Sequence, residues 1–392
     1  MTREVERIRR EDTDELLEFL NKAFTGDPAS GHFESNMPRM CRSEKRLCEH
    51  YAVRENGKIC AALGVFPYDV TIGNGNLRFA TVGNIGVAEE CRGKGYMRVL
   101  MTEAMRILEE TDTDVSRLGG LRSRYENYGY EPCGIIHRFT LTPRNALDVQ
   151  SRKEIGNYSF REMSAEDAGA LETAEKLYSR NPIRIHRSAF GDFYDSLRMW
   201  GSVPYAVYDQ NGRIAGYLCS DAAGKTVHEY GCVDEPDLFG MLCSFVIWRG
   251  QEITYNVYPW EIDVGREFSR FSEAYAAGIP SHFKVLKWEK LISALMEMKH
   301  GMQPLSRGRL RVNVSGYGTL RIDFDGGRCS CDREPESRDA EALTLDPLAM
   351  CRLCFGPCPP MFTLRDPTDQ NDSALIGSWF PLPLSWNPCD NL

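Results

Sequence analysis

Apolar side chains recur at two different spacings along the chain, and each spacing predicts a kind of element. In residues 13–24 and 96–110 they fall three or four positions apart, which places them on one face of an α-helix. Residues 77–87 and 115–118 are strand-like apolar runs. The pattern predicts helices and strands that alternate along the chain, in a mixed α/β and α+β fold.

One short pattern occurs twice, which indicates a duplicated unit. Residues 51–59 read YAVRENGKI and residues 205–214 read YAVYDQNGRI. In both, strand-forming residues flank an Asn-Gly pair, which supplies the positive φ angles of a tight hairpin turn. Further predictions flank both copies: strands at 4–8 and 158–162, and helices at 13–24 and 165–178, the last with Ser164 as N-cap. We interpret the two segments as diverged copies of one β-α-β-β unit.

The composition changes after about residue 287. The predicted elements there are strands at 310–314, 319–324 and 328–331 and a helix at 346–355 with Asp346 as its cap. A tail rich in Pro and Trp, residues 379–392, carries too much apolar surface to remain in solvent. We therefore expect three domains, at residues 1–148, 149–287 and 288–392.

The charge and composition of the whole chain argue against some partners. Its 392 residues include 47 Lys and Arg against 56 Asp and Glu, a net charge of −9, which gives no support for nucleic-acid binding. The longest apolar stretch, residues 238–248, is shorter than the roughly 20 residues that span a bilayer. The first residues form no apolar signal region, and the 14 cysteines are interpreted as reduced thiols. We expect a soluble cytoplasmic protein that binds neither nucleic acid nor membranes.

Residues 85–98 carry the strongest candidate for a binding site. A predicted strand ends at Val87, the loop AEECRGKG follows, and a helix begins at Tyr96. A helix N-terminus offers unpaired N–H groups, glycines allow the backbone to approach a ligand, and Arg92, Lys94 and Arg98 add charge, so the segment predicts an anion-binding loop. It lacks the endings of a P-loop and of a dinucleotide-binding loop. The alternative is a tight strand-to-helix turn with a solvated basic loop.

The run Arg92-Gly93-Lys94-Gly95 after a strand resembles the Arg/Gln-x-x-Gly-x-Gly/Ala signature of the GNAT acyltransferases, which binds the pyrophosphate of acetyl-CoA. Met97 departs from it, because it stands where the signature has a small residue. With its duplicated unit and third domain, the chain is similar to the Eis-like (enhanced intracellular survival) acetyltransferases. That resemblance implies tandem GNAT folds, the N-terminal one active and the central one degenerate, followed by a sterol-carrier-like α+β domain.

The resemblance also implies which residues bind the cofactor. Backbone groups of Ile85 and Val87 are expected to bind the pantetheine arm and to polarise the thioester carbonyl. No metal is expected. The residues expected to bind acetyl-CoA are Ile85, Gly86, Val87, Arg92, Gly93, Lys94, Gly95, Tyr96, Met97, Arg98, Gly120 and Leu121.

The segment RYENYGYE, residues 124–131, resembles the Tyr-x-x-x-Gly-Tyr/Phe segment of the family. By that match Tyr125 is the general acid that protonates the departing CoA thiolate. A phenol has a pKa of about 10, so it is neutral at pH 7 and has a proton to give. Tyr128 and Tyr130 are the alternatives, and a packed aromatic turn is the purely structural explanation of all three.

The general base is less visible in the sequence. The resemblance implies the C-terminal carboxylate, here that of Leu392, acting from the third domain. A terminal carboxylate has a reference pKa of about 3.5 and is a weak base in water, although burial raises its pKa. A water relay, loss of the ammonium proton before attack, and a frayed terminus are the alternatives.

The second copy differs where the first has its glycine-rich loop. Residues 233–240 read VDEPDLFG, and the carboxylates of Asp234, Glu235 and Asp237 would repel a pyrophosphate. We expect this copy not to bind CoA and to be structural; an acidic wall that attracts polycationic amines is the alternative. Core packing explains the spacing of the late cysteines better than zinc does; these are Cys329, Cys331, Cys351, Cys354 and Cys358.

These observations predict an acetyl-CoA-dependent N-acetyltransferase that moves the acetyl group by direct transfer to a primary amine. Aminoglycosides, polyamines and lysine peptides all remain open as acceptors, and the resemblance includes aminoglycoside acetylation. One alternative is an enzyme that transfers a longer acyl group. Another is a lipid- or small-molecule-binding protein with vestigial GNAT units. By resemblance we expect a homo-oligomer, a hexamer.

Overall fold

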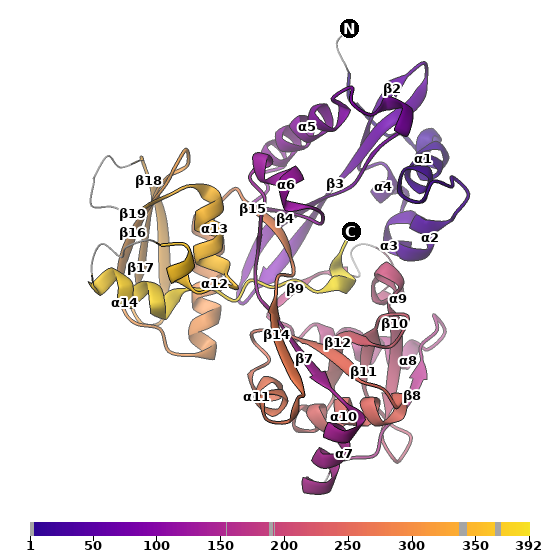
Figure 1. Ribbon diagram of the computed structural model, residues 1–392, viewed down its shortest axis with the longest axis vertical. Helices are drawn as coiled ribbons and strands as arrows, with labels where there is room; N and C mark the ends of the chain where they lie inside the picture. Colours follow the sequence, from indigo (N-terminus) through magenta and orange to yellow (C-terminus); the bar gives the residue numbers. More distant parts are fainter. Residues whose placement is uncertain (1–3, 154, 188–190, 192, 337–342, 365–369) are drawn as a thin grey trace. The chain divides into compact units, whose positions relative to one another are not determined.

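The computed structural model describes residues 4–153, 155–187, 191, 193–336, 343–364 and 370–392 (Figure 1). The chain forms two compact units: unit 1 holds residues 1–134, 281–384 and 392, and unit 2 holds residues 135–280 and 385–391. Among the described residues, no helix combines the length and the apolar character needed to cross a membrane. The division into domains at residues 148 and 287 remains a prediction.

Unit 1 contains a mixed sheet that brings together strands from distant parts of the chain. In spatial order its strands are β1 (Glu6–Arg7), β2 (His50–Glu55), β3 (Lys58–Ile72), β4 (Gly75–Val87), β5 (Val115–Leu118), β15 (Ser281–Val285) and β6 (Glu131–Cys133). β1 to β4 are antiparallel to their neighbours, β4 and β5 are parallel, and β15 is antiparallel to both β5 and β6. The sheet therefore includes β15, a strand that is far in sequence from the strands on either side of it.

Short and long helices accompany this sheet. They are α1 (Thr13–Thr25), α2 (His32–Asn36), α3 (Pro38–Cys41), α4 (Glu44–Leu47), α5 (Tyr96–Glu110) and α6 (Arg122–Tyr125). The predicted helix at 96–110 is confirmed: Leu100, Met101, Ala104 and Leu108 are fully buried in one core cluster with β3 and β4. Met97, in the first turn of the same helix, is only partly buried. The apolar stripe of α5 therefore positions the loop that precedes it.

The rest of unit 1 contains a second, smaller sheet. Its four strands lie in the order β18 (Cys329–Glu334), β17 (Gly318–Phe324), β16 (Gly308–Val314) and β19 (Leu343–Leu345), and its helices are α12 (Trp288–Met302), α13 (Pro347–Phe355) and α14 (Gln370–Trp379). The predicted cap of α13 is confirmed, because the Asp346 carboxylate accepts a hydrogen bond from the N–H of Ala349 at 2.8 Å. The apolar tail is buried as expected: Trp379, Leu382 and Leu384 have no exposed surface.

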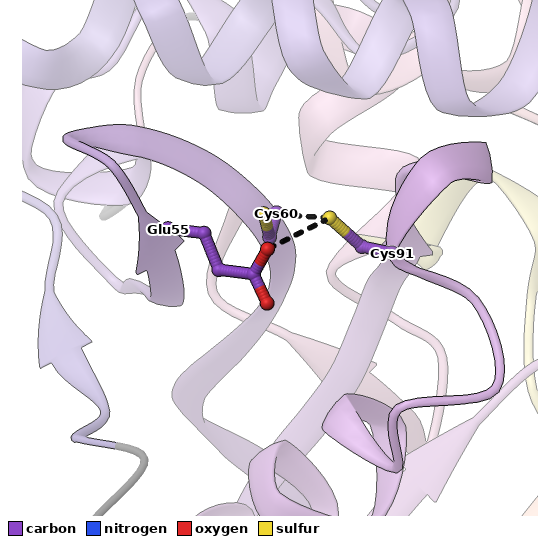
Figure 2. A group of neighbouring side chains, drawn as sticks. All are labelled: Glu55, Cys60 and Cys91. Atoms are coloured by element: carbon purple, nitrogen blue, oxygen red, sulfur yellow. Dashed lines mark hydrogen bonds between the residues drawn. The ribbon is translucent and has the colours of Figure 1, made fainter. Parts of the chain in front are cut away.

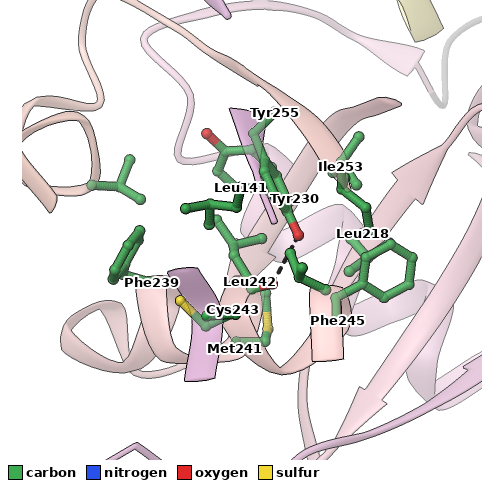
Figure 3. Packing of buried hydrophobic residues seen from close by; sticks show 14 of the residues in the cluster. Leu141, Leu218, Tyr230, Phe239, Met241, Leu242, Cys243, Phe245, Ile253 and Tyr255 are labelled. Carbon is green, nitrogen blue, oxygen red and sulfur yellow. Dashed lines mark hydrogen bonds between the residues drawn. The ribbon is translucent and has the colours of Figure 1, made fainter. Parts of the chain in front are cut away.

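Unit 2 contains a seven-stranded sheet. In spatial order its strands are β14 (Ala274–Gly278), β7 (Ile136–Leu141), β13 (Ile253–Val257), β12 (Thr226–Cys232), β11 (Ile214–Ser220), β10 (Val203–Tyr208) and β8 (Ser159–Glu162). The other elements of this unit are β9 (Ile183–Ile185), α7 (Pro143–Arg152), α8 (Ala168–Tyr178), α9 (Phe193–Leu197), α10 (Leu238–Arg249) and α11 (Ile262–Phe271). Leu242 and Phe245 of the apolar helix α10 pack against strand residues, and the Tyr255 hydroxyl donates to the Leu242 carbonyl at 2.8 Å (Figure 3).

The two large sheets share one strand order and one pattern of strand directions. β12 and β13 are parallel as β4 and β5 are, and each pair is followed by two antiparallel strands. In each sheet these two strands come from different parts of the chain. β7 follows β6 in sequence but joins the sheet of unit 2, and β15 follows β14 but joins the sheet of unit 1. Each sheet is therefore completed by a strand from the other half of the repeat.

Two local predictions for the second copy are wrong. The first hairpin has the expected positive φ angles, 50° at Asn56 and 79° at Gly57, but in the second only Gly212 has one, at 74°. The extra residue of the second copy makes a longer loop there. Ser164 is not the cap of α8, because the helix begins at Ala168, and the Asp167 carboxylate accepts a hydrogen bond from the Ser164 N–H at 2.8 Å.

Candidate active site

β4 contains a β-bulge just before its last residues. Ala62 of β3 pairs with Gly86 of β4, but Gly64 pairs with Gly83, so β4 has one residue more than β3 between these pairs. Asn84 lies in the bulge with φ of 55°, in the left-handed region that non-glycine residues seldom adopt. A bulge turns the backbone that follows it. This one therefore sets the direction of the peptide groups at residues 85–87.

A buried histidine holds the bulge in place. His50 has no exposed surface, its Nδ1 donates to the Leu47 carbonyl at 2.9 Å, and its Nε2 lies 3.1 Å from the amide nitrogen of Asn84. Burial lowers the pKa of His50 to about 4, so the ring is neutral at pH 7 and Nε2 accepts from Asn84. Neither residue stands out in the sequence, because neither belongs to a motif and they lie on different strands.

The end of β4 lies beyond its pairing with β5. The two strands pair only from Phe79 to Thr81 on β4, opposite Val115 to Arg117 on β5. β4 continues to Val87, and in the part of the chain that the structure describes no strand pairs with this side of β4 after Thr81. Ile85 and Val87 are partly buried. Their backbone groups are thus available to an extended ligand in place of a strand.

The loop between β4 and α5 combines glycines of positive φ with an uncapped helix start. Gly93 and Gly95 have φ angles of 78° and 80°, which favour glycine, and Gly95 is the residue before the first turn of α5. No side chain caps α5, so the N–H groups of its first turn are not used by a capping side chain. Arg92 is exposed and makes no ion pair among the described residues. The helix begins at Tyr96 as expected, and anion binding by the loop stays a prediction.

The Lys94 side chain is bound within the protein. Its Nζ lies 2.8 Å from a carboxylate oxygen of Glu55, and this hydrogen bond raises the pKa of Lys94. The hydroxyl of Tyr96 donates to the same carboxylate, so the side chain of Tyr96 serves this contact rather than a ligand. Part of the positive charge expected of the loop is therefore balanced by Glu55.

Two cysteines lie beside this carboxylate (Figure 2). The Sγ atoms of Cys60 and Cys91 are 2.7 Å apart, and Sγ of Cys91 is 4.0 Å from Glu55. Burial, with the Cys91 contact second, raises the pKa of Cys60 to about 12. Among the described residues these three form a group whose ligand atoms lie within 4.8 Å of one another. The Glu55 carboxylate is already bound to Lys94 and Tyr96, so a cation would have to compete with them.

Two residues expected at the cofactor lie further along α5. Met97 is partly buried against the core cluster of this domain. Arg98 is exposed and lines a cavity of about 380 Å³ together with Val5 and Glu103. The structure thus places Met97 in packing and Arg98 on an open part of the helix.

The three tyrosines of residues 124–131 have different surroundings. Tyr130 is fully buried, and its hydroxyl lies 2.7 Å from that of Ser116. Tyr125 is buried except for 6% of its surface, and no described residue forms a hydrogen bond with its hydroxyl. Burial raises the pKa of Tyr125, against a small opposite effect of Arg124. Tyr128 is partly buried and packs against the core cluster to which Tyr125 and Tyr130 belong. Of the three, Tyr125 combines a fixed ring with an unengaged hydroxyl.

Gly120 and Leu121 precede this tyrosine. Gly120 has a φ of 143°, and a Cβ atom there would lie 2.5 Å from Cε2 of Tyr125. Leu121 is 60% exposed and is the residue before α6. Gly120 therefore contacts the candidate acid, and Leu121 has a free side chain.

The last residue of the sequence, Leu392, lies against β4. It is buried, and its backbone oxygen would be 3.3 Å from a Cβ atom on Gly83. Gly83 is the residue just before the bulge. The frayed end considered as an alternative for this residue does not occur here.

The part of unit 1 that runs from β1 to β6 matches a known family. Residues 4–133 match the family model of the acetyltransferase (GNAT) domain. This segment is a GNAT acetyltransferase domain. The match ends at the last residue of β6. The protein is therefore an enzyme, with a GNAT acetyltransferase domain at residues 4–133. Among curated proteins, no sequence matches the chain.

Solved structures resemble the whole chain at low identity. A conserved protein from Enterococcus faecalis V583 has a TM-score of 0.68 and 16% identity, with 97% of each chain covered. A GCN5-related N-acetyltransferase from Anabaena variabilis has a TM-score of 0.66 and 13% identity, with 98% of each chain covered. Eis1 from Mycobacterium abscessus has a TM-score of 0.64 and 14% identity, with 98% of each chain covered. These likenesses show a mixed α and β fold of the GNAT kind.

The residues of the GNAT domain fit an acyl-CoA. The diphosphate of CoA needs N–H donors and positive charge, which the uncapped start of α5, the loop glycines and Arg92 provide. The pantetheine arm carries amide groups, and β4 has an unpaired side beyond Thr81 among the described residues. The donor set of this domain thus matches the chemistry of its acyl donor.

Proposed function

We propose that the protein transfers an acetyl group from acetyl-CoA directly to a primary amine at the end of β4. The observation that carries this proposal is where Tyr125 lies. Its ring belongs to the same core cluster as Leu100, and Ile85 and Val87 pack against that cluster. A proton donor and an unpaired strand end are thus parts of one packed region.

Each group has a chemical task in this proposal. Acetyl-CoA supplies an acetyl thioester. The N–H groups from Gly93 to the start of α5 bind its diphosphate, with Arg92 and Lys94, and the backbone of residues 85–87 orients the pantetheine arm and polarises the thioester carbonyl. Tyr125 gives its proton to the leaving sulfur. The raised pKa of Tyr125 keeps that proton in place until the thiolate forms.

For the general base we propose the carboxylate of Leu392. Its support is the position of the Leu392 oxygen beside Gly83, on the strand whose bulge leads into residues 85–87. Burial of a carboxylate raises its pKa and makes it a better base. If a water relay acts as the base instead of Leu392, Tyr125 can still be the general acid.

We also propose the domain identities, the acceptors, the cellular location and the assembly of the whole chain. Unit 2 is a degenerate second GNAT fold, supported by its shared strand order, and residues 288–392 are a sterol-carrier-like domain. The acceptors are aminoglycosides, polyamines or lysine side chains. The protein acts in the cytoplasm as a homo-oligomer, a hexamer.

The test is an acetylation assay on the full-length protein. Acetyl-CoA is incubated with spermidine, kanamycin or a lysine peptide, and thiol release is followed. Loss of a general acid reduces turnover by roughly 10²- to 10⁴-fold, so Tyr125→Phe should lower kcat by about that factor with unchanged acetyl-CoA affinity. Tyr128→Phe is the matched control. Equal kcat in the two variants would contradict the role of Tyr125.

The same assay separates the alternatives. Release of thiol from longer acyl-CoAs but not from acetyl-CoA would indicate a different acyl donor. No thiol release with any amine, and no acetyl-CoA binding by titration calorimetry, would favour a binding protein with a vestigial GNAT domain and overturn the proposal.

A further inference from the structure

Unit 2 contains a cavity of about 920 Å³ beside the end of its parallel strand pair. It is lined by the end of β12, by the segment that leads into α10, and by residues 260–267, which include the start of α11. Ligand sites of proteins measure about 300–1,000 Å³. Size alone makes this cavity a candidate site.

The cavity lies where the first copy has its proposed cofactor site. β12 pairs with β13 only at Thr226 and Val227, and β12 continues to Cys232. β4 leaves β5 in the same way after Thr81 and leads into the loop before α5. The fold thus keeps a separated strand pair and a helix start in both copies, and in unit 2 these features border an open cavity.

The cavity has the opposite charge from an anion site. At the start of α10 it presents Glu235 and Asp237, where the first copy has Arg92 and Lys94. Asp237 accepts a hydrogen bond from the Tyr158 hydroxyl at 3.0 Å and forms no ion pair among the described residues. These carboxylates lie in the segment just before the helix, where their negative charge repels a phosphate.

The cations that line the cavity are already paired. Lys153 binds Glu267, Arg266 lies 2.7 Å from Asp263, and Arg180 lies 3.8 Å from Glu235. Each of these positive charges is matched by a carboxylate of the same wall. The carboxylates of Asp237 and Glu261 are left without a cationic partner among the described residues.

Glu261 brings a carboxylate to the inner wall. Its Oε2 accepts hydrogen bonds from the Tyr258 N–H at 2.7 Å and from the Tyr230 hydroxyl at 2.8 Å, while Oε1 has no hydrogen bond to any described residue. Burial raises the pKa of Glu261 to about 7. A nearby ammonium would favour the ionised form of this group.

Aromatic rings complete the wall next to that carboxylate. Tyr230, Phe239 and Trp260 line the cavity, and the ring of Trp260 stacks on that of Tyr258 at 5.1 Å. Aromatic faces attract organic cations, and a neighbouring carboxylate adds the attraction of opposite charge. Polar and apolar parts of one ligand would both find partners here.

We propose that this cavity is a second ligand site, specific for an aliphatic amine, with the ammonium group at Glu261 and the carbon chain against Trp260 and Phe239. Asp237 at the rim takes a second ammonium group where the ligand is a polyamine. The site is formed by residues of unit 2, and this proposal does not rest on the proposed acetyl transfer.

The test is titration calorimetry of the full-length protein with spermidine, in the absence of acetyl-CoA, with uncharged 1,8-octanediol as the control ligand. Wild-type protein should bind spermidine and not the diol. Glu261→Gln should weaken one class of spermidine site at least tenfold or remove it, and Asp237→Asn should weaken it severalfold. Glu172→Gln, an exposed acidic position on α8, is the matched control and should bind as the wild type does.

Three outcomes would overturn the proposal. These are no spermidine binding by the wild type, equal binding by both cavity variants and the wild type, and binding of the diol as strong as that of spermidine. Asp237→Asn changes an exposed residue, so it decides the question if Glu261→Gln fails to fold. Acetyl-transfer activity is measured separately, and its absence would contradict the proposed function without affecting this titration.

Discussion

A Cβ atom on Gly120 would lie 2.5 Å from Cε2 of Tyr125, well inside the distance at which two carbon atoms pack. The backbone at Gly120 also has a φ of 143°, which L side chains seldom adopt. The neighbouring Gly119 has nothing within 4 Å of the same position. The ring of Tyr125 therefore packs directly against the backbone of Gly120 and not against that of Gly119.

We expect Gly120→Ala to impair catalysis through Tyr125. The new methyl group displaces the ring, and a misplacement of about 1 Å at a reacting group costs up to roughly 100-fold in rate. The strained backbone should also cost about 1–3 kcal/mol of stability. Steady-state kinetics and thermal unfolding measure the two effects. Gly119→Ala is the matched control and should keep both kcat and stability; equal kcat in the two variants would refute the role of this contact.

The pH dependence of kcat should show that Tyr125 acts in its protonated form. Burial raises the pKa of this phenol above its usual value near 10. The acid form is therefore retained at every pH below about 10, and kcat should not decline on the alkaline side of the profile before that pH. A decline with a midpoint near pH 8 that disappears in Tyr125→Phe would show instead that the pKa of Tyr125 is lowered.

Stability should fall with acidification because of His50. The folded protein has a pKa of about 4 for this residue, against about 6.5 in an unfolded chain. Between those values the unfolded chain takes up a proton and the folded chain does not. His50 therefore leaves the free energy of unfolding unchanged above pH 6.5 and lowers it progressively as the pH falls toward 4. The loss reaches about 3 kcal/mol at pH 4.

Urea unfolding at pH 7 and pH 5 measures this effect, and His50→Gln should reduce the difference between the two. Protonation also removes the acceptor for Asn84, so acetyl-transfer activity should decline in the same pH range. An unchanged difference in His50→Gln would mean that other groups cause the acid sensitivity.

The two basic residues of the loop should contribute unequally to acetyl-CoA binding. Lys94 is bound to Glu55, whereas Arg92 makes no ion pair among the residues described. Arg92→Met should weaken binding about tenfold, which corresponds to about 1.4 kcal/mol, and Lys94→Met should weaken it less. Titration calorimetry with acetyl-CoA measures both. Arg106→Met, near the other end of α5, is the control; a larger effect of Lys94→Met would contradict the pairing with Glu55.

The position of Leu392 should be sensitive to small changes. Gly83→Ala puts a methyl group 3.3 Å from the Leu392 oxygen, which displaces the oxygen by a few tenths of an ångström. We expect a severalfold lower kcat, and a larger loss when one residue is added after Leu392. Gly75→Ala, on the same strand with only ordinary contacts, should behave as the wild type. An extended protein with full activity would exclude the Leu392 carboxylate as base.

Local patterns in the sequence predicted the elements whose causes are local. The apolar spacing of residues 96–110 predicted α5, and the Asn56-Gly57 pair predicted the first hairpin, because a helix face and a tight turn depend on residues a few positions apart. The glycines before Tyr96 predicted the turn that leads into α5 for the same reason. In the second copy a single extra residue was enough to change the turn.

The tertiary structure alone decided the features that join distant residues. The exchange of β7 and β15, the contact between His50 and Asn84, the approach of Leu392 to Gly83 and the cavity of unit 2 each depend on segments far apart in sequence. Helix and turn signals are encoded in neighbouring side chains, whereas such contacts follow from how whole strands pair and pack. The sequence therefore determined which residues could bind a phosphate, and the fold decided which side chains surround them.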